Sequence, residues 1–77
     1  MKLGETEENL IHSAREGNRY AMAQLLQANY SIVYKYCLKL TLNKEEAQDI
    51  TQEVMARAVA KIRLYDDRKA SISTWLI

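Results

Sequence analysis

Hydrophobic residues recur at helical spacing through most of the chain and predict three helices. The first predicted helix spans about 6–16, and its narrow apolar stripe consists of Leu10, Ile11 and Ala14. Thr6 is the predicted N-cap, because the two glutamates after it suit the positive end of a helix. Gly17 is predicted to end this helix, because glycine adopts the left-handed conformation at little cost.

The second predicted helix spans about 19–42, which corresponds to roughly 36 Å at 1.5 Å per residue. Asn18 precedes it and can cap it. Apolar residues cover two adjoining stripes of this helix, which is typical of the central helix of a bundle. One stripe runs through Leu25 and Ile32, and the other runs through Leu26, Val33 and Leu40.

The third predicted helix spans about 44–65 and has the clearest start signal. Asn43 is followed three residues later by Glu46, which is the arrangement of a capping box. One face of this helix is apolar, and we expect Ile50, Val54 and Ile62 to be core residues. The whole apolar face consists of Ala47, Ile50, Val54, Ala58, Ile62 and Tyr65. The other face carries Asp49, Gln52, Glu53, Ala56, Arg57 and Lys61.

Residues 66–73 are polar, break the helical period and are predicted to form a loop. Ser71 or Ser73 can cap a fourth helix that starts near Thr74 and covers 74–77. With one turn only, this helix is expected to leave the loop unbraced. The sequence therefore predicts one all-α domain over 1–77, a three-helix bundle with a truncated fourth helix.

Composition agrees with one small soluble helical domain. The 77 residues include no proline and only two glycines, so the chain lacks the turn residues that an all-β fold needs. The single cysteine, Cys37, excludes a disulfide scaffold. No signal peptide or membrane-length apolar run is recognised, so we expect a cytoplasmic protein.

Charge is unevenly distributed although the net charge is only +1. One lysine against four acidic residues gives −3 over 44–53, and five basic residues against two aspartates give +3 over 57–69. An acidic stretch followed by a basic stretch suggests two different partners. Ordinary solvated helix faces would give the same pattern, so charge alone leaves both interpretations open.

The residues that could carry chemistry do not predict an enzyme. His12 and Cys37 are the only residues of their kinds, they are far apart, and nothing would orient the histidine as a base. Cys37 is expected in the core and His12 on the surface. No glycine loop for phosphate and no convergent metal ligands are present in the sequence, so no cofactor and no metal are expected.

The aromatic residues leave one question open. The four tyrosines of the second helix, at 20, 30, 34 and 36, are expected to cover the bundle with their hydroxyls in water rather than to stack on bases. Trp75 follows a basic loop at a helix start, where an indole could anchor the core or stack on a nucleotide. Both roles stay open for Trp75.

A set of short motifs resembles region 2 of bacterial sigma factors. Asp49-Ile50-Thr51-Gln52-Glu53 is similar to the family's Asp-apolar-x-Gln-Glu. The accompanying motifs are Gly17-Asn18-x-x-Ala21, Glu46-Ala47-Gln48-Asp49, Met55-Ala56-Arg57-Ala58 and Ser73-Thr74-Trp75-Leu76. They occur in one order over about residues 8 to 77, and the compact form resembles the extracytoplasmic-function group. The chain departs from the family in having no phenylalanine, with Met22, Met55 and Ile72 at positions where the family often has one.

The resemblance implies a transcription initiation domain without enzymatic activity. Such a domain docks on the β′ clamp helices of RNA polymerase core and recognises and helps to melt the promoter −10 element. The implied polymerase-binding residues are Asp49, Gln52 and Glu53, with Val33 and Tyr30 extending the patch.

The loop 66–73 would hold a base flipped from the non-template strand. The implied DNA-binding residues are Arg57, Lys61, Arg68, Lys69, Ser71, Ser73, Thr74 and Trp75. An anti-sigma factor is a further expected partner, and no membrane contact is expected.

Two alternatives stay open beside this interpretation. The first is a sigma-like interaction module that binds polymerase or an anti-sigma factor without recognising a promoter on its own. The second is a DNA-binding regulator of helix-turn-helix type. The second fits less well, because the third helix is long and its acidic half would oppose the phosphates of a DNA groove.

Overall fold

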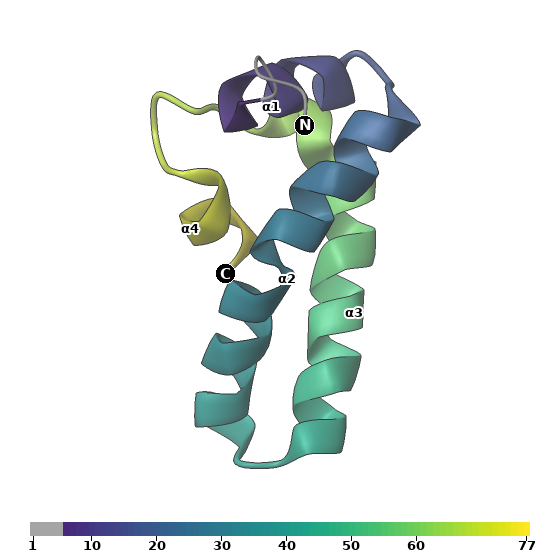
Figure 1. Cartoon of the computed structure of the whole chain (residues 1–77). Coiled ribbons are helices and arrows are strands. Elements are labelled where there is room, and N and C mark those ends of the chain that lie inside the picture. Colours follow the sequence, from purple (N-terminus) through teal and green to yellow (C-terminus); the bar gives the residue numbers. More distant parts are fainter. Residues whose placement is uncertain (1–5) are drawn as a thin grey trace.

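The computed structural model describes residues 6–77 and shows an all-α fold over that range (Figure 1). Its elements are α1 (Glu7–Arg15), α2 (Arg19–Thr41), α3 (Lys44–Lys61), the short 3-10 turn η1 (Ile62–Leu64) and α4 (Ile72–Leu76). The predicted all-α class is confirmed. Residues 1–5, which belong to the predicted domain 1–77, lie outside the described residues.

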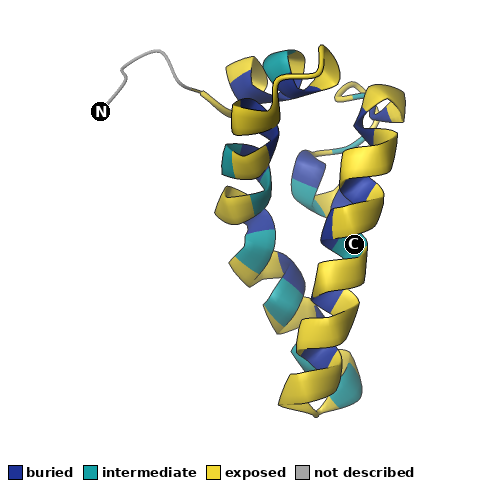
Figure 2. Ribbon diagram, turned by 90° about the vertical axis from the view of Figure 1, so that its right-hand side faces the viewer, coloured by how far each residue is buried: buried dark blue, intermediate teal, exposed yellow. Residues whose placement is uncertain are grey.

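Helices α2 and α3 form an antiparallel pair that runs the length of the molecule (Figure 1). The 23 residues of α2 give a helix about 35 Å long, close to the 37 Å long axis of the molecule. Helix α1 crosses one end of the pair, and α4 packs against both α2 and α3 (Figure 1). Figure 2 shows the buried residues on the sides of the helices that face one another.

Within residues 6–77 a side-chain cap starts each of the four α-helices, and the predicted caps at Thr6, Asn18 and Asn43 are confirmed. The side chain of Asn43 accepts the backbone N–H of Glu46 at 3.0 Å. The second half of the predicted capping box is replaced, because the backbone N–H of Asn43 donates to the hydroxyl of Thr41 at 3.2 Å.

Helices α1 and α2 end in left-handed residues of different kinds. Gly17 has φ +98°, and its N–H donates to the carbonyl of Ala14 while the N–H of Asn18 donates to that of Ser13, each at 3.0 Å. These two bonds make a Schellman motif, so the predicted end of α1 is confirmed. Leu42, which ends α2, has φ 56° and is 85% exposed. A left-handed leucine is unusual, because its Cβ crowds the following carbonyl.

The core lies between α2 and α3 and is covered by α1 and α4. On α2 it follows a ladder with a period of four residues, formed by Ala21, Leu25, Asn29, Val33 and Cys37. Asn29 satisfies its buried amide within α2, where Nδ2 donates to the carbonyl of Leu25 at 2.8 Å. The predicted burial of Cys37 is confirmed.

The predicted core face of α3 is partly wrong. Ile50 is 40% exposed and Val54 is half-buried, whereas Ile62 is buried as expected. The buried positions are Ala47, Thr51, Met55, Ala58 and Ile62. Because Thr51 is polar, the sequence does not show that the face of α3 that contains it is the buried one. Its hydroxyl donates to the carbonyl of Ala47 at 2.7 Å, so it needs no partner on another helix.

Two expected stripe residues of α2 are also on the surface, since Ile32 is 48% and Leu40 is 68% exposed. Only one side of α2 faces the core, so each of the two predicted stripes is buried at some positions and exposed at others.

The C-terminal boundaries differ from those predicted. Helix α3 gives way to η1 at Ile62 instead of continuing to Tyr65. Helix α4 begins at Ile72 instead of Thr74, because Ser71 is the cap. No helix in residues 6–77 is long and apolar enough to cross a membrane.

Candidate functional site

Helix α3 carries two polar surfaces of opposite character. Asp49 and Glu53 each lie two residues from buried positions, which places them on the side of the helix away from the core, because two residues turn a helix by about 200°. Arg57 and Lys61 instead lie on the flank that faces α4, where they line a pocket together with Trp75. Along α3 the acidic group lies nearer the turn to α2, and the basic group lies nearer η1.

The acidic surface, which we define as Asp49, Gln52 and Glu53, is fully accessible to a partner. All three residues are exposed, and within the described part of the chain none of their side chains is engaged in a hydrogen bond or ion pair. Carboxylates and an amide in this state can accept charge-assisted bonds from arginine side chains of another protein.

The two α2 residues that were expected to extend the acidic surface differ from each other. Val33 is 1% exposed and packs in the core, so the expectation that it contacts a partner is wrong. Tyr30 is half-buried, and its ring stacks on that of Tyr34 with centroids 6.4 Å apart. Tyr30 therefore remains a candidate contact residue through its accessible part.

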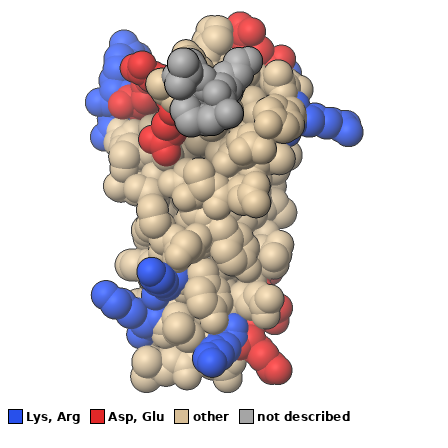
Figure 3. Space-filling model, viewed as in Figure 1, with Lys and Arg blue, Asp and Glu red and all other residues tan. Residues whose placement is uncertain are grey.

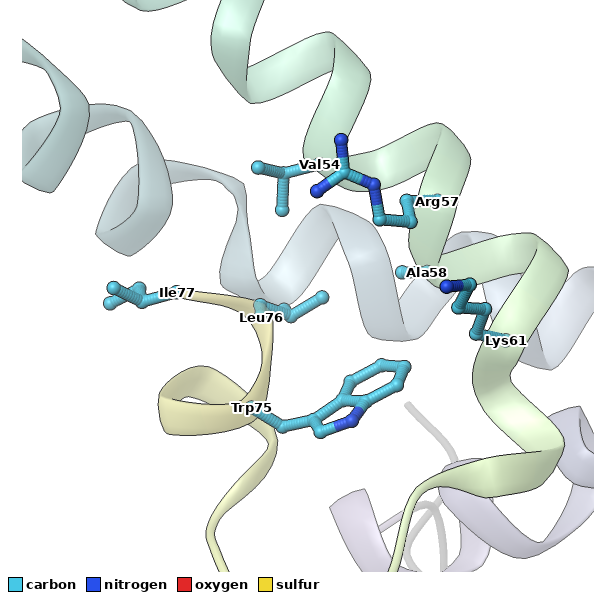
Figure 4. Close-up of a pocket in the computed structure, with 7 residues that line it drawn as sticks. All are labelled: Val54, Arg57, Ala58, Lys61, Trp75, Leu76 and Ile77. Atoms are coloured by element: carbon cyan, nitrogen blue, oxygen red, sulfur yellow. The ribbon is translucent and has the colours of Figure 1, made fainter.

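A pocket of about 200 Å³ opens between α3 and α4 (Figure 4). Its lining consists of Val54, Arg57, Ala58, Lys61, Trp75, Leu76 and Ile77. Figure 4 shows the indole of Trp75 on one side and the side chains of Arg57 and Lys61 on the other. An aromatic face next to two cations can hold a flat base by stacking and its phosphate by charge.

The loop between η1 and α4 is held in place by its own bonds. The hydroxyl of Tyr65 donates to the carbonyl of Ala70 at 2.6 Å, and the N–H of Lys69 donates to the carbonyl of Asp66 at 3.0 Å. The ring of Tyr65 also packs against Trp75, with centroids 5.2 Å apart. The expectation of an unbraced loop is therefore wrong, because the side chain of Tyr65, which follows η1, holds the loop in place through Ala70 and Trp75.

Within this loop Arg68 is bonded to Asp66. The guanidinium Nε and Nη2 donate to the two carboxylate oxygens at 3.1 Å each. Hydrogen bonds from Arg68 lower the pKa of Asp66 to about 2, and the same carboxylate raises the pKa of Arg68. Of the two basic loop residues expected to contact DNA, Arg68 is thus paired, while the side chain of Lys69 is exposed and has no partner in the described chain.

The hydroxyl residues expected at the DNA come together at the start of α4. Ser71 accepts the backbone N–H of Thr74 at 3.3 Å and donates to the hydroxyl of Thr74 at 2.9 Å. The hydroxyls of Ser71 and Ser73 lie 3.3 Å apart. These groups therefore fix the first turn of α4. Ser71 and Thr74 are exposed, Ser73 is half-buried, and Thr74 directly precedes Trp75.

Charged residues are absent from the middle of the face seen in Figure 3, where lysine, arginine, aspartate and glutamate gather toward the two ends. The sequence explains part of this pattern, because no charged residue occurs between Arg19 and Lys35. A further hollow, between α1 and η1, is lined by His12, Arg15, Glu16 and Arg63. His12 is exposed, as predicted, and lies 3.5 Å from Glu16.

Tyr65 is the site residue that the sequence did not reveal. The spacing of apolar residues in the third predicted helix placed Tyr65 on the core face, and it is indeed only 2% exposed. A tyrosine at a core position carries a hydroxyl that needs a buried partner, and this requirement is the signal that could have linked it to the loop. No group of His, Cys, Asp and Glu within residues 6–77 is arranged to hold a metal ion.

Comparisons with known proteins agree on one family. The family model for Sigma-70 region 2 matches residues 25–77, a range that includes the acidic surface, the pocket and the loop. The ECF RNA polymerase sigma factor SigW of Bacillus subtilis (strain 168) is 32% identical over 66 residues, which cover 86% of this chain and 35% of that protein. The chain therefore spans about a third of the length of that relative. No solved structure matches the chain at a significant level.

Proposed function

The chain belongs to the sigma-70 region 2 family, in its extracytoplasmic-function group, and from this we propose that it docks on RNA polymerase core and captures the non-template strand of the promoter −10 element. The observation that carries the proposal is the division of α3 into an acidic surface and a basic flank. One rigid helix can thereby hold a protein partner and a nucleic acid at a fixed spacing.

The acidic surface is the proposed polymerase contact. Asp49, Gln52 and Glu53 are exposed on one rigid helix, which limits the entropy lost when a partner binds. Their oxygens would accept bonds from arginines on the β′ clamp helices. The accessible part of Tyr30 is proposed to extend this surface, because its ring is already held against that of Tyr34.

The pocket and the loop beside it are the proposed DNA contact. A base taken out of the duplex would enter next to Trp75, and its phosphates would lie along Arg57, Lys61 and Lys69. Thr74 and the hydroxyls of Ser71 and Ser73 are proposed to contact the same strand. A protein that binds only the open strand shifts the equilibrium toward opening, so no enzymatic activity is required.

The docking half of the proposal is tested by charge reversal at Glu53. Glu53→Lys should weaken the affinity for polymerase core by about tenfold or more, because it replaces an acceptor by a like charge facing arginines. Glu16→Lys is the matched control, since it makes the same change at the exposed C-cap residue that follows α1, away from the acidic surface. Equal affinities of the two variants, with equal helical circular dichroism, would show that the acidic surface is not the contact.

The DNA half is tested by titrating labelled single strands of about 15 nucleotides and the corresponding duplexes at two salt concentrations. We expect weak binding to the single strand, a shallow salt dependence because few cations are available, and still weaker binding to the duplex. Tight binding to the duplex with a steep salt dependence and no preference for the open strand would contradict base capture.

A second candidate function is favoured by one observation. Because Asp66 pairs with Arg68, the loop presents little free positive charge to DNA. This fits a sigma-like interaction module that binds polymerase or an anti-sigma factor without promoter recognition on its own. Polymerase binding that depends on Glu53, together with no measurable binding to single strands, would favour this candidate.

A further inference from the structure

Tyr65 stands where three parts of the molecule meet. It follows η1 directly, and its backbone N–H closes that turn by donating to the carbonyl of Ile62 at 3.1 Å. Its side chain is almost completely buried, being 2% exposed, and reaches both the loop and α4. Its hydroxyl bonds to the loop backbone, and its ring packs against that of Trp75.

The hydroxyl of Tyr65 fixes the far end of the loop. It donates to the carbonyl of Ala70 at 2.6 Å, and Ala70 directly precedes Ser71, the cap of α4. Burial disfavours the phenolate and, with the nearby carboxylates of Asp67, Glu7 and Asp66, raises the pKa of Tyr65. The group therefore stays a hydrogen-bond donor at neutral pH.

The ring of Tyr65 fixes the wall of the pocket. Its centroid lies 5.2 Å from that of Trp75 and the two planes are inclined by 51°, within the range of favourable aromatic pairs. The indole thus has one side against Tyr65 while it lines the pocket with Arg57 and Lys61. A change at Tyr65 can therefore alter the loop and the indole together.

We propose that Tyr65 is a positioning residue for single-strand capture, with its hydroxyl holding the loop and its ring holding Trp75 in the binding arrangement. The inference rests on the proposed function, because it assumes that the loop and the pocket receive DNA. Its physical basis is preorganisation, since a loop that is already ordered loses less conformational entropy on binding. The two contributions are separable, because phenylalanine keeps the ring and removes only the hydroxyl.

The test compares Tyr65→Phe with Tyr36→Phe in the same titration of labelled single-stranded DNA of about 15 nucleotides. Tyr36 is 44% exposed on α2, and its hydroxyl has no partner in the described chain, so this control removes the same atom without loosening the loop. We expect Tyr65→Phe to weaken binding about threefold to tenfold, as the loss of one ordering hydrogen bond would. The control should bind like the unchanged protein.

Trp75 supplies an independent readout because it is the only tryptophan. Tyr65→Phe should leave the emission of the free protein close to unchanged, since the ring contact stays. Tyr65→Leu should shift the emission to longer wavelength and weaken binding further, because Trp75 loses its aromatic neighbour. Helical circular dichroism at the assay temperature shows whether each variant is folded.

The outcomes separate the two levels of the argument. If the unchanged protein binds no single strand, the proposed function fails and the positioning role fails with it. If it binds and Tyr65→Phe binds equally well, the proposed function stands and the role of Tyr65 is overturned. If the affinity of Tyr65→Phe falls only together with its helical signal, the effect is a loss of fold and the positioning role is likewise overturned.

Discussion

Asp66 binds the guanidinium of Arg68 through both of its carboxylate oxygens and also accepts the backbone N–H of Arg68, at 2.9 Å. The side chain of Arg68 is 86% exposed, so solvent and salt screen the pair. The pair therefore sets the shape of the loop and the availability of Arg68 more than it sets the stability of the fold.

The protonation of Asp66 is predicted to depend on Arg68. Hydrogen bonds from Arg68 hold the pKa of Asp66 at about 2, so the pair is complete above the ordinary carboxyl pKa and is lost as the pH falls through about 2. Arg68→Ala keeps the backbone N–H that Asp66 accepts but removes the two guanidinium bonds, so it should move the titration midpoint of Asp66 part of the way up toward about 3.9. Carboxyl chemical shifts followed by NMR measure this midpoint, and an unchanged value in Arg68→Ala would contradict the pairing.

Release of Arg68 is predicted to strengthen DNA binding. Asp66→Asn removes the charge that holds the guanidinium, so the arginine becomes available to a phosphate. One added phosphate contact should steepen the slope of log affinity against log salt for a single strand by about 0.7. Asp67→Asn is the control, because it removes the same charge from the loop without breaking the two bonds to Arg68. Equal slopes in both variants would mean that only net charge matters.

The corrected phase of α3 gives a stability prediction. Met55 is 7% exposed whereas Ile50 is 40% exposed, although both are large and apolar. Met55→Ala should lower the free energy of unfolding by about 2–5 kcal/mol, and Ile50→Ala by less than about 1 kcal/mol. Urea denaturation followed by circular dichroism measures both. A larger loss of stability in Ile50→Ala than in Met55→Ala would show that the core face predicted from the sequence, which contains Ile50, is the right one.

Leu42 is predicted to be a site of stabilising substitution. Its φ of 56° strains a side chain with a Cβ, and 85% of the residue is exposed, so little packing would be lost. Leu42→Gly should raise the free energy of unfolding by about 1 kcal/mol. Leu40→Ala is the control, since it trims an exposed leucine from the regular part of α2. A gain in the control as large as that in Leu42→Gly would point to exposed apolar surface rather than to backbone strain.

The sequence predicted the starts of α1, α2 and α3 well because their causes are local. Thr6, Asn18 and Asn43 each lie three residues before the N–H that they accept, so a short motif contains the whole interaction. The end of α1 at Gly17 was predictable for the same reason. The number and order of the main helices followed from these signals together with the apolar period.

Other features depended on contacts that a period does not reveal. Thr51 can be completely buried because its hydroxyl bonds to the Ala47 carbonyl within the same helix. The pattern of apolar residues alone therefore placed Ile50 on the core face of α3, which is wrong. Val33 was placed on the docking patch by resemblance, but it lies in the buried ladder of α2 and is 1% exposed.

For the candidate site, the sequence indicated which residue types are present but not how they are coupled. Asp49, Gln52 and Glu53 are exposed together because their i, i+3 and i+4 spacing places them on one face of a single helix. The pairing of Arg68 with Asp66 and the contact of Tyr65 with Trp75 depend on the path of the loop, which no helical period describes. Whether these residues bind polymerase and DNA stays a prediction.

The connection between α2 and α3 consists of only Leu42 and Asn43, and its brevity has a consequence for how the chain acquires its fold. Residues that pack across the pair near this turn are close in sequence, so little loop entropy opposes their meeting. Chains dominated by such local contacts fold within microseconds to milliseconds. We therefore expect the hairpin of residues 19–61 to form during synthesis, before the loop and α4 have left the ribosome, so that Tyr65 and Trp75 close onto a surface that already exists.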